Sequence, residues 1–213
     1  MAEVVPSILV KDRNELIEKL SVANSFAEVF HLDVTDGIFV NSLTLNDPVV
    51  MPELASGLSF SVHLMVAKPE NHIVKWLASG ADQFIFHIES TSKAQTVINY
   101  AKEADKQIGV ALNPETNFSE IESVVNEVDF VHFLSVKPGF YGGKFDESVA
   151  DKIKDFHFYY PDKTIWVDGG VNPQNAPDLV RAGASVLIVG NFIFSAQKPE
   201  EAFAEIKGSI ENV

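Results

Sequence analysis

The sequence predicts an α/β fold of the (β/α)8 TIM barrel class. Eight short, strand-like runs alternate with helix-like segments along the whole chain. Several of these runs are almost continuously apolar, which is typical of parallel strands covered on both faces. Such alternation leaves two architectures, a closed barrel and an open doubly wound sheet. We favour the barrel because no glycine-rich GxGxxG loop follows the first expected strand, and the early Pro6-Ser7 pair offers no dinucleotide-binding loop.

The expected strands are Val4–Leu9, Val29–Val34, Phe60–Val66, Gln83–His87, Ile108–Leu112, Phe130–Val136, Thr164–Asp168 and Val186–Val189. The helices between them follow from apolar stripes at helical spacing, from proline in a first turn and from glycine at an end. They are Asn14–Ala23, Pro69–Ser79, Lys93–Ala104, Phe118–Asn126, Ser148–Tyr159, Gln174–Ala182 and Glu200–Ile210, with Asp47–Ser56 as the weakest.

Composition narrows the class of protein further. The 213 residues are 46% apolar and 22% charged, and we expect one domain over residues 1–213 because no linker or composition shift interrupts them. The sequence contains no run of about 18 apolar residues, so no membrane span is predicted. The sequence has no cysteine, which excludes disulfides and thiolate ligands. We expect no signal peptide and a cytoplasmic location.

The net charge of −14 argues against nucleic acid as a partner, because binding phosphate backbones requires clustered Lys and Arg. An anionic small molecule would therefore have to be bound by local donors.

Four side chains of metal-ligand type stand at the ends of expected strands. They are His31, Asp33, His63 and Asp168. The strand period of two places His31 and Asp33 on one face, and barrels hold their active sites at the C-terminal strand ends. We therefore expect two imidazoles and two carboxylates around one divalent ion. Any one of these residues alone would more often be a satisfied polar group or a helix cap.

Asp33 and Asp168 also predict a reaction class. They lie on the second and seventh expected strands, so they would approach a substrate from opposite faces. Inverting a stereocentre beside a carbonyl needs a base on one face and an acid on the other. A divalent ion would stabilise the enediolate between the two proton transfers, and the two carboxyl titrations would be coupled.

Glycines after the seventh and eighth expected strands predict a phosphate site. These loops read Asp168-Gly169-Gly170 and Val189-Gly190-Asn191. Glycine lets backbone N–H groups approach an anion closely, and barrels often bind phosphate at this position. Tight turns without a ligand are the alternative.

Further features lie near the expected mouth of the barrel. The glycine-rich segment 137–145 predicts a lid that would exclude water, with an ordinary surface turn as the alternative. His87 ends the fourth strand and is expected to line the mouth. His132 has inward-compatible parity, and we expect a structural role for it.

Six motifs together are specific. They are Val5-Pro6-Ser7-Ile8-Leu9, His31-Leu32-Asp33-Val34-Thr35-Asp36-Gly37-Ile38-Phe39-Val40, Val62-His63-Leu64-Met65-Val66, Ala111-Leu112-Asn113-Pro114-Glu115-Thr116, Pro138-Gly139-Phe140 and Val167-Asp168-Gly169-Gly170-Val171-Asn172. Through them the chain resembles the ribulose-phosphate 3-epimerase family over nearly its whole length. The resemblance implies a barrel of the ribulose-phosphate-binding type that interconverts D-ribulose 5-phosphate and D-xylulose 5-phosphate.

The resemblance also implies roles for single residues. His31, Asp33, His63 and Asp168 would bind the metal, and Asp33 and Asp168 would be the catalytic pair. The implied substrate-binding residues are Ser7, His63, Met65, Gly139, Gly142, Gly143, Asp168, Gly169, Gly170, Gly190 and Asn191.

The chain departs from the family's usual pattern at several positions. The family usually has Met at the positions of Thr35 and Leu134, Pro-Asn at Asn41-Ser42, Gly at Tyr141 and Ser at Asn191. None of these positions is a predicted metal ligand or catalytic carboxylate.

Other functions stay open at this point. Epimerisation of a ketohexose phosphate such as D-allulose 6-phosphate would use the same chemistry, and a non-catalytic sugar-phosphate-binding barrel would keep the same scaffold. A decarboxylase or aldol-type synthase is disfavoured because the chain has no Asp-x-Lys-x-x-Asp motif. Zn²⁺ is our first choice of ion, with Mn²⁺, Co²⁺ and Fe²⁺ as alternatives. The resemblance implies a homo-oligomer, either a dimer or a hexamer.

Overall fold

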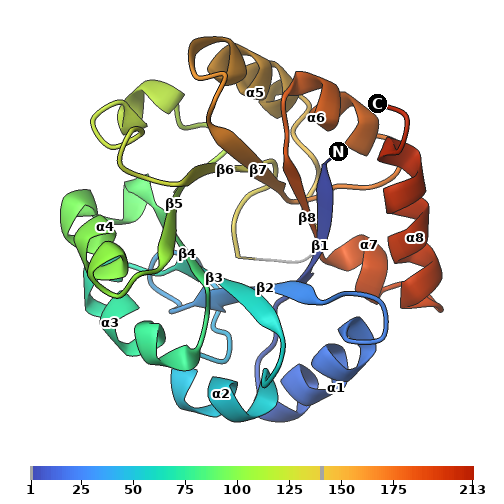
Figure 1. Cartoon of the computed structure of the whole chain (residues 1–213), viewed down its shortest axis with the longest axis horizontal. Helices are drawn as coiled ribbons and strands as arrows, with labels where there is room; N and C mark the ends of the chain where they lie inside the picture. Colours follow the sequence, from blue (N-terminus) through green and yellow to red (C-terminus); the bar gives the residue numbers. More distant parts are fainter. Residues whose placement is uncertain (1, 140–141) are drawn as a thin grey trace.

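The computed structural model is a closed barrel of eight parallel strands in chain order, surrounded by helices (Figure 1). It describes residues 2–139 and 142–213. The strands are β1(Glu3–Ile8), β2(Val29–Thr35), β3(Ser59–Met65), β4(Gln83–His87), β5(Gln107–Leu112), β6(Phe130–Leu134), β7(Thr164–Asp168) and β8(Val186–Val189). The last strand pairs in parallel with the first, which closes the ring. The predicted barrel is therefore confirmed over the open doubly wound sheet.

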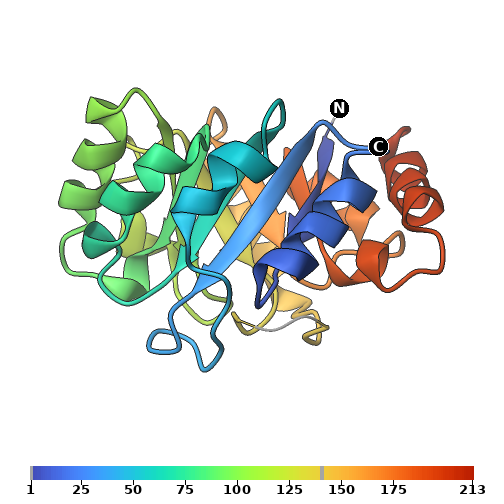
Figure 2. The same ribbon diagram turned by 90° about the horizontal axis from the view of Figure 1, so that it is seen from below.

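Helices cover the outside of this ring (Figures 1 and 2). The α-helices are α1(Arg13–Ala23), α2(Met51–Leu54), α3(Ile73–Trp76), α4(Ala94–Glu103), α5(Ser148–Tyr159), α6(Ala176–Ala182), α7(Asn191–Phe194) and α8(Pro199–Ile210). Short 3₁₀ helices are η1(Pro48–Val50), η2(Pro69–Asn71), η3(Leu77–Ser79), η4(Ile88–Ser90) and η5(Phe118–Ile121). Local chemistry fixes their starts; the Asp12 side chain, for example, accepts hydrogen bonds from the first turn of α1.

Every predicted strand is present, with ends shifted by no more than two residues. The helix predicted over Phe118–Asn126 is wrong beyond Ile121, where hydrogen-bonded turns replace it. The β-branched pair Val124 and Val125 lowers the helix propensity there, because such side chains are restricted in a helix, and both are nevertheless buried in the turns. The predicted helix Pro69–Ser79 is divided among η2, α3 and η3. The short helix α7 was not predicted.

The interior of the barrel has an apolar floor, which consists of Val5, Ile85, Ala111, Phe130, Trp166, Val186 and Ile188. Phe130 stacks on Trp166 with ring centroids 4.1 Å apart. Gly109 makes room for this stack, because a Cβ atom there would lie 2.2 Å from the Phe130 ring. Because these side chains fill the barrel interior at this level, we expect the site above them, at the C-terminal strand ends.

The loops that follow β2 and β6 extend from one end of the barrel, and both termini lie toward the other end (Figure 2). The loop ends of the strands therefore form the mouth of the barrel. In the ranges that the structure describes, no helix has both the length and the apolar character needed to cross a membrane.

Candidate active site

The structure brings the four predicted metal ligands together at the mouth of the barrel. Pairing of β2 with β3 sets Asp33 opposite His63, and their side chains meet with Oδ1 3.0 Å from Nδ1. The Asp168 Oδ2 atom, from β7, lies 3.8 Å from the same His63 nitrogen. The His31 Nε2 atom lies 3.5 Å from the Asp33 Oδ1 atom. Two carboxylates from different sides of the ring thus flank one buried imidazole.

His31 is oriented by its neighbour on β3. Its Nδ1 atom lies 2.8 Å from the Ser61 hydroxyl oxygen, and the register pairs the two residues directly. This contact turns the Nε2 atom of His31 toward the carboxylates. That nitrogen is buried and has no hydrogen-bond partner among the residues that the structure describes.

A chain of hydrogen bonds orients His63 from the other side. Its Nε2 atom lies 2.9 Å from the Nε2 atom of His87, and the Nδ1 atom of His87 lies 3.2 Å from a Glu89 carboxylate oxygen. Glu89 in turn accepts a hydrogen bond from the backbone N–H of Asn113. A carboxylate can only accept, so His87 donates from Nδ1. Two proton arrangements satisfy the rest of this chain.

In one arrangement neutral His87 accepts at Nε2 from His63, which leaves a lone pair on the Nδ1 atom of His63. In the other, His87 is a cation and His63 donates from Nδ1 to Asp33. A metal-ligating His63 requires the first arrangement, because a ligand nitrogen must be unprotonated. In that arrangement Glu89 would orient His63 through His87, as carboxylates commonly do behind metal-bound histidines.

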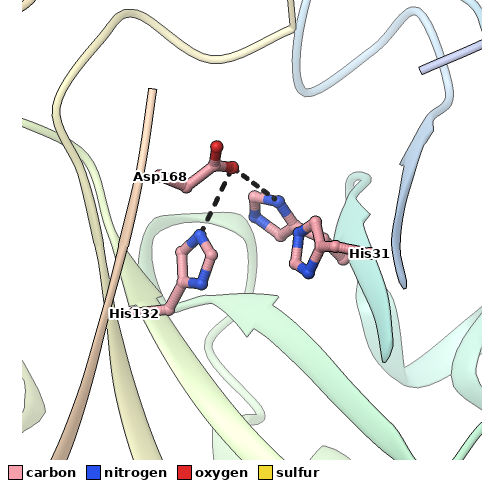
Figure 3. Close-up of side chains that lie close together, drawn as sticks. His31, His132 and Asp168 are labelled. Carbon is pink, nitrogen blue, oxygen red and sulfur yellow. Dashed lines mark ion pairs between the residues drawn. The ribbon is translucent and has the colours of Figure 1, made fainter. Parts of the chain in front are cut away.

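His132 extends the same cluster from β6 (Figure 3). Its Nε2 atom lies 3.5 Å from the Asp168 Oδ2 atom, and its ring is nearly parallel to that of His31. Within residues 2–139 and 142–213, neither ring nitrogen has a hydrogen-bond partner, although the side chain is fully buried. His31, His63, His132 and Asp168 each offer one ligand atom, and these atoms all lie within 4.8 Å of one another.

These donors fit a divalent ion. Zn–N distances are about 2.0–2.1 Å, so two ligands of one ion are at most ~4.2 Å apart, close to the separations in this cluster. Imidazole and carboxylate are donors that zinc and its first-row neighbours accept. The orphaned nitrogens of His31 and His132 face this group. The buried His/Asp group could therefore bind a metal ion.

The electrostatics separate the two carboxyl groups. Burial opposes ionisation of Asp33, but the adjacent His31 and His63 side chains outweigh it and hold the pKa of this carboxyl well below its usual range. Burial and the nearby charge of Asp33 raise the pKa of Asp168 to about 6. Burial lowers the pKa of His63 to about 3, despite its contact with Asp33. The protein thus holds one ionised carboxylate, one carboxyl that retains its proton below about pH 6, and a neutral imidazole.

A cavity of about 230 Å³ opens beside the cluster. The predicted substrate-binding residues that line it are Ser7, Met65, Gly139, Gly142, Gly143, Asp168, Gly169, Gly170, Gly190 and Asn191. Asp33 and Leu134 also line it, whereas His63 stands in the cluster beside it. Gly169 has a φ of 107°, and a Cβ atom there would lie 2.4 Å from Val136, so the bend after β7 requires glycine.

Asp36, in the motif that begins at His31, stabilises the loops at the mouth. Its side chain accepts hydrogen bonds from the backbone N–H groups of Ile38, Phe39 and Ala67. Two departures from the family pattern contact each other, with the Ser42 hydroxyl 3.3 Å from that of Thr35. Phe140 and Tyr141, in the predicted lid, lie outside the described residues.

Sequence reasoning underestimated parts of this site. It placed His87 at the mouth and His132 inside the barrel, but it attached no importance to Glu89 or Ser61. The spacing His87-x-Glu89 at a strand end and the register of Ser61 with His31 were available signals. The contact of His132 with Asp168 depends on the stagger of β6 against β7, which no local pattern reveals.

A closed (β/α)8 barrel with a buried His/Asp group and a glycine-lined cavity at its mouth defines the class of barrel enzymes that act at the C-terminal strand ends. A model of the ribulose-phosphate 3 epimerase family matches residues 3–194. The chain therefore belongs to this family, and as a member it is an isomerase. The family implies a phosphorylated sugar as its substrate.

Individual relatives agree with this assignment. The ribulose-phosphate 3-epimerase of Bacillus subtilis (strain 168) is 36% identical to this chain, with 98% of the chain and 100% of the relative covered. The chloroplastic ribulose-5-phosphate-3-epimerase of Arabidopsis thaliana is 38% identical, with 97% and 76% covered. Among solved structures, KGPDC from Streptococcus mutans has a TM-score of 0.73 at 15% identity, with 100% and 99% covered. That likeness concerns the fold alone.

Proposed function

We propose that this protein is a metal-dependent epimerase that interconverts D-ribulose 5-phosphate and D-xylulose 5-phosphate. The observation that carries the proposal is the placement of Asp33 and Asp168, which come from β2 and β7 and flank the same His63 nitrogen at 3.0 and 3.8 Å. Both also line the cavity beside the glycine loops. A ketose phosphate held in this cavity would have a carboxyl group on each side of its C3 atom.

In the proposed mechanism one carboxylate removes the C3 proton and the other carboxyl group delivers a proton to the opposite face. The direction of the reaction decides which of Asp33 and Asp168 acts as base. His31, Asp33, His63 and Asp168 would hold the divalent ion, for which Zn²⁺ is the first choice and Mn²⁺, Co²⁺ and Fe²⁺ are alternatives. When bound, the ion supplies Lewis-acid stabilisation of the negative charge of the enediolate.

The phosphate of the substrate would lie against the glycine loops. Gly169, Gly170 and Gly190 line the cavity, and Gly190 leads into the short helix α7. Backbone N–H groups bind an anion without a basic surface, which suits a chain with a net charge of −14. Ser7 and Met65 would contact the sugar from β1 and β3.

The decisive experiment measures epimerisation of D-ribulose 5-phosphate after chelation and after reloading with each of the four ions in turn. We expect turnover to vanish on chelation and to return with at least one ion. Full turnover without metal would contradict the proposed metal dependence. Metal binding without turnover would instead favour a non-catalytic sugar-phosphate-binding barrel.

A ketohexose phosphate such as D-allulose 6-phosphate is a second candidate substrate. The hydroxyl group of Thr35 favours it, because it stands near the mouth where the resemblance implies apolar Met, and it accepts a hydrogen bond from the hydroxyl group of Ser42. Comparing kcat/KM for the two sugars decides between them. We further propose a cytoplasmic homo-oligomer, a dimer or a hexamer, whose mass light scattering in solution would measure.

A further inference from the structure

His132 is the most unusual buried side chain of the barrel. It follows Phe130 on β6 by one strand period, so its ring points into the barrel just above the apolar floor. The side chain is fully buried, and neither nitrogen has a hydrogen-bond partner in the described part of the chain. Leaving two polar atoms unsatisfied in this position costs folding free energy, so an apolar side chain would be the more stable choice unless a ligand satisfies them.

The surroundings of His132 indicate what that ligand is. Its ring centroid lies 4.7 Å from that of His63 and 5.5 Å from that of His31. Its Nε2 atom lies 3.5 Å from the Asp168 carboxylate. One ligand atom from each of His31, His63, His132 and Asp168 lies within 4.8 Å of the others. Unsatisfied nitrogens, two further imidazoles and a carboxylate thus surround one point, which is the environment of a cation.

We propose that His132 is a third imidazole donor to the divalent ion, beside His31 and His63. This inference rests on the proposed metal-dependent function and adds one ligand to the set that the family resemblance implies. His132 does not line the substrate cavity, whereas Asp33 and Asp168 do. Donation from His132 therefore leaves the cavity side of the ion available to the substrate. A third nitrogen donor also biases the site toward Zn²⁺ or Co²⁺ over Mn²⁺.

The first test compares Zn²⁺ affinity in the wild type and in His132→Leu by competition with a chromophoric chelator. We expect affinity to fall at least ten-fold in the variant. His132→Phe keeps a planar ring without donor atoms and serves if the leucine variant does not fold. His157→Leu, on the exposed face of α5, is the matched control and should bind Zn²⁺ as the wild type does.

The second test has readouts that a merely structural role would not produce. X-ray absorption at the zinc edge should count three imidazoles in the wild type and two in His132→Leu. Metal-free His132→Leu should also unfold at a higher temperature than the metal-free wild type, because the unsatisfied nitrogens are gone, while its stabilisation by Zn²⁺ should be smaller. Two imidazoles in the wild type, or unchanged affinity in both variants, would overturn the inference. If the wild type bound no divalent ion, the proposed function itself would fail.

Discussion

The interior of this barrel changes character within one strand period. On β6, apolar Phe130 is followed two residues later by His132, and on β7 Trp166 is followed by Asp168. The lower pair stacks face to face at 4.1 Å. The upper pair lies 3.5 Å apart with unsatisfied nitrogen on the histidine. The packed floor therefore contributes stability. The mouth instead contains buried polar groups whose hydrogen-bonding capacity would be satisfied by a ligand or a proton.

This difference shows how one set of strands serves two purposes. The floor supplies a rigid base, so the carboxyl groups two residues above it hold fixed positions on opposite sides of the cavity. Changes in the mouth should therefore reduce chemistry and metal binding, and changes in the floor should reduce stability. The following variants test that separation, in order of decreasing expected effect.

Asp33→Asn should give the largest loss. It removes one member of the proposed acid/base pair, and such groups contribute about 10²–10⁴-fold to turnover. We expect kcat for D-ribulose 5-phosphate to fall by that factor while the circular dichroism spectrum is unchanged. Asp162→Asn, in an exposed turn, is the control. Retention of full turnover by the Asp33 variant would refute the two-carboxylate mechanism.

Asp168→Asn should change the pH dependence of stability in metal-free protein. The folded pKa of Asp168 is raised to about 6, so the wild type is penalised as pH rises from about 4 through 6. A shift from 3.8 to about 6 corresponds to ~3 kcal/mol at about 1.4 kcal/mol per pKa unit. Urea unfolding in the presence of chelator should show that the free energy of unfolding of the variant rises relative to that of the wild type across this pH range. Parallel stability curves would show that Asp168 is not forced to ionise in a buried site.

Gly109→Ala tests the floor. The new Cβ atom would meet the Phe130 ring at 2.2 Å, and overpacking of this kind costs about 1–3 kcal/mol. Gly208→Ala is the matched control, because nothing lies within 4 Å of its added Cβ atom and alanine favours the helix α8. Thermal unfolding should separate the two, with turnover per folded molecule unchanged in both. Loss of turnover in folded Gly109→Ala would show that floor and mouth are not separable.

Glu89→Gln should give the smallest of these effects. A carboxylate can only accept a hydrogen bond, whereas the amide of Gln can also donate one, so the variant no longer requires a proton on the Nδ1 atom of His87. The His63 tautomer required for metal binding is then less favoured. We expect Zn²⁺ affinity to fall about ten-fold, equivalent to about 1.4 kcal/mol. The exposed Glu122→Gln variant should bind Zn²⁺ normally. Equal affinities would show that the hydrogen-bond chain does not support the metal site.

The sequence was sufficient for the barrel because the strands are nearly continuous apolar runs, and their period places His31, Asp33 and His63 correctly. It failed for the segment after Ile121, where helical spacing of apolar residues coexists with β-branched side chains of low helix propensity. It also undervalued His132 and Glu89. Their roles depend on which atoms meet across strands, and this is set by the stagger of the barrel and not by the residues next to them in sequence.

The most direct test of the central claim is the fate of the C3 proton when the reaction runs in D₂O. Proton removal by one carboxylate and delivery by the other predicts that D-xylulose 5-phosphate isolated at low conversion carries deuterium at C3. The D-ribulose 5-phosphate recovered with it should retain its original hydrogen. If the product instead kept the original hydrogen of the substrate, or if both sugars were labelled equally from the first turnovers, the proposed division of roles between Asp33 and Asp168 would be wrong.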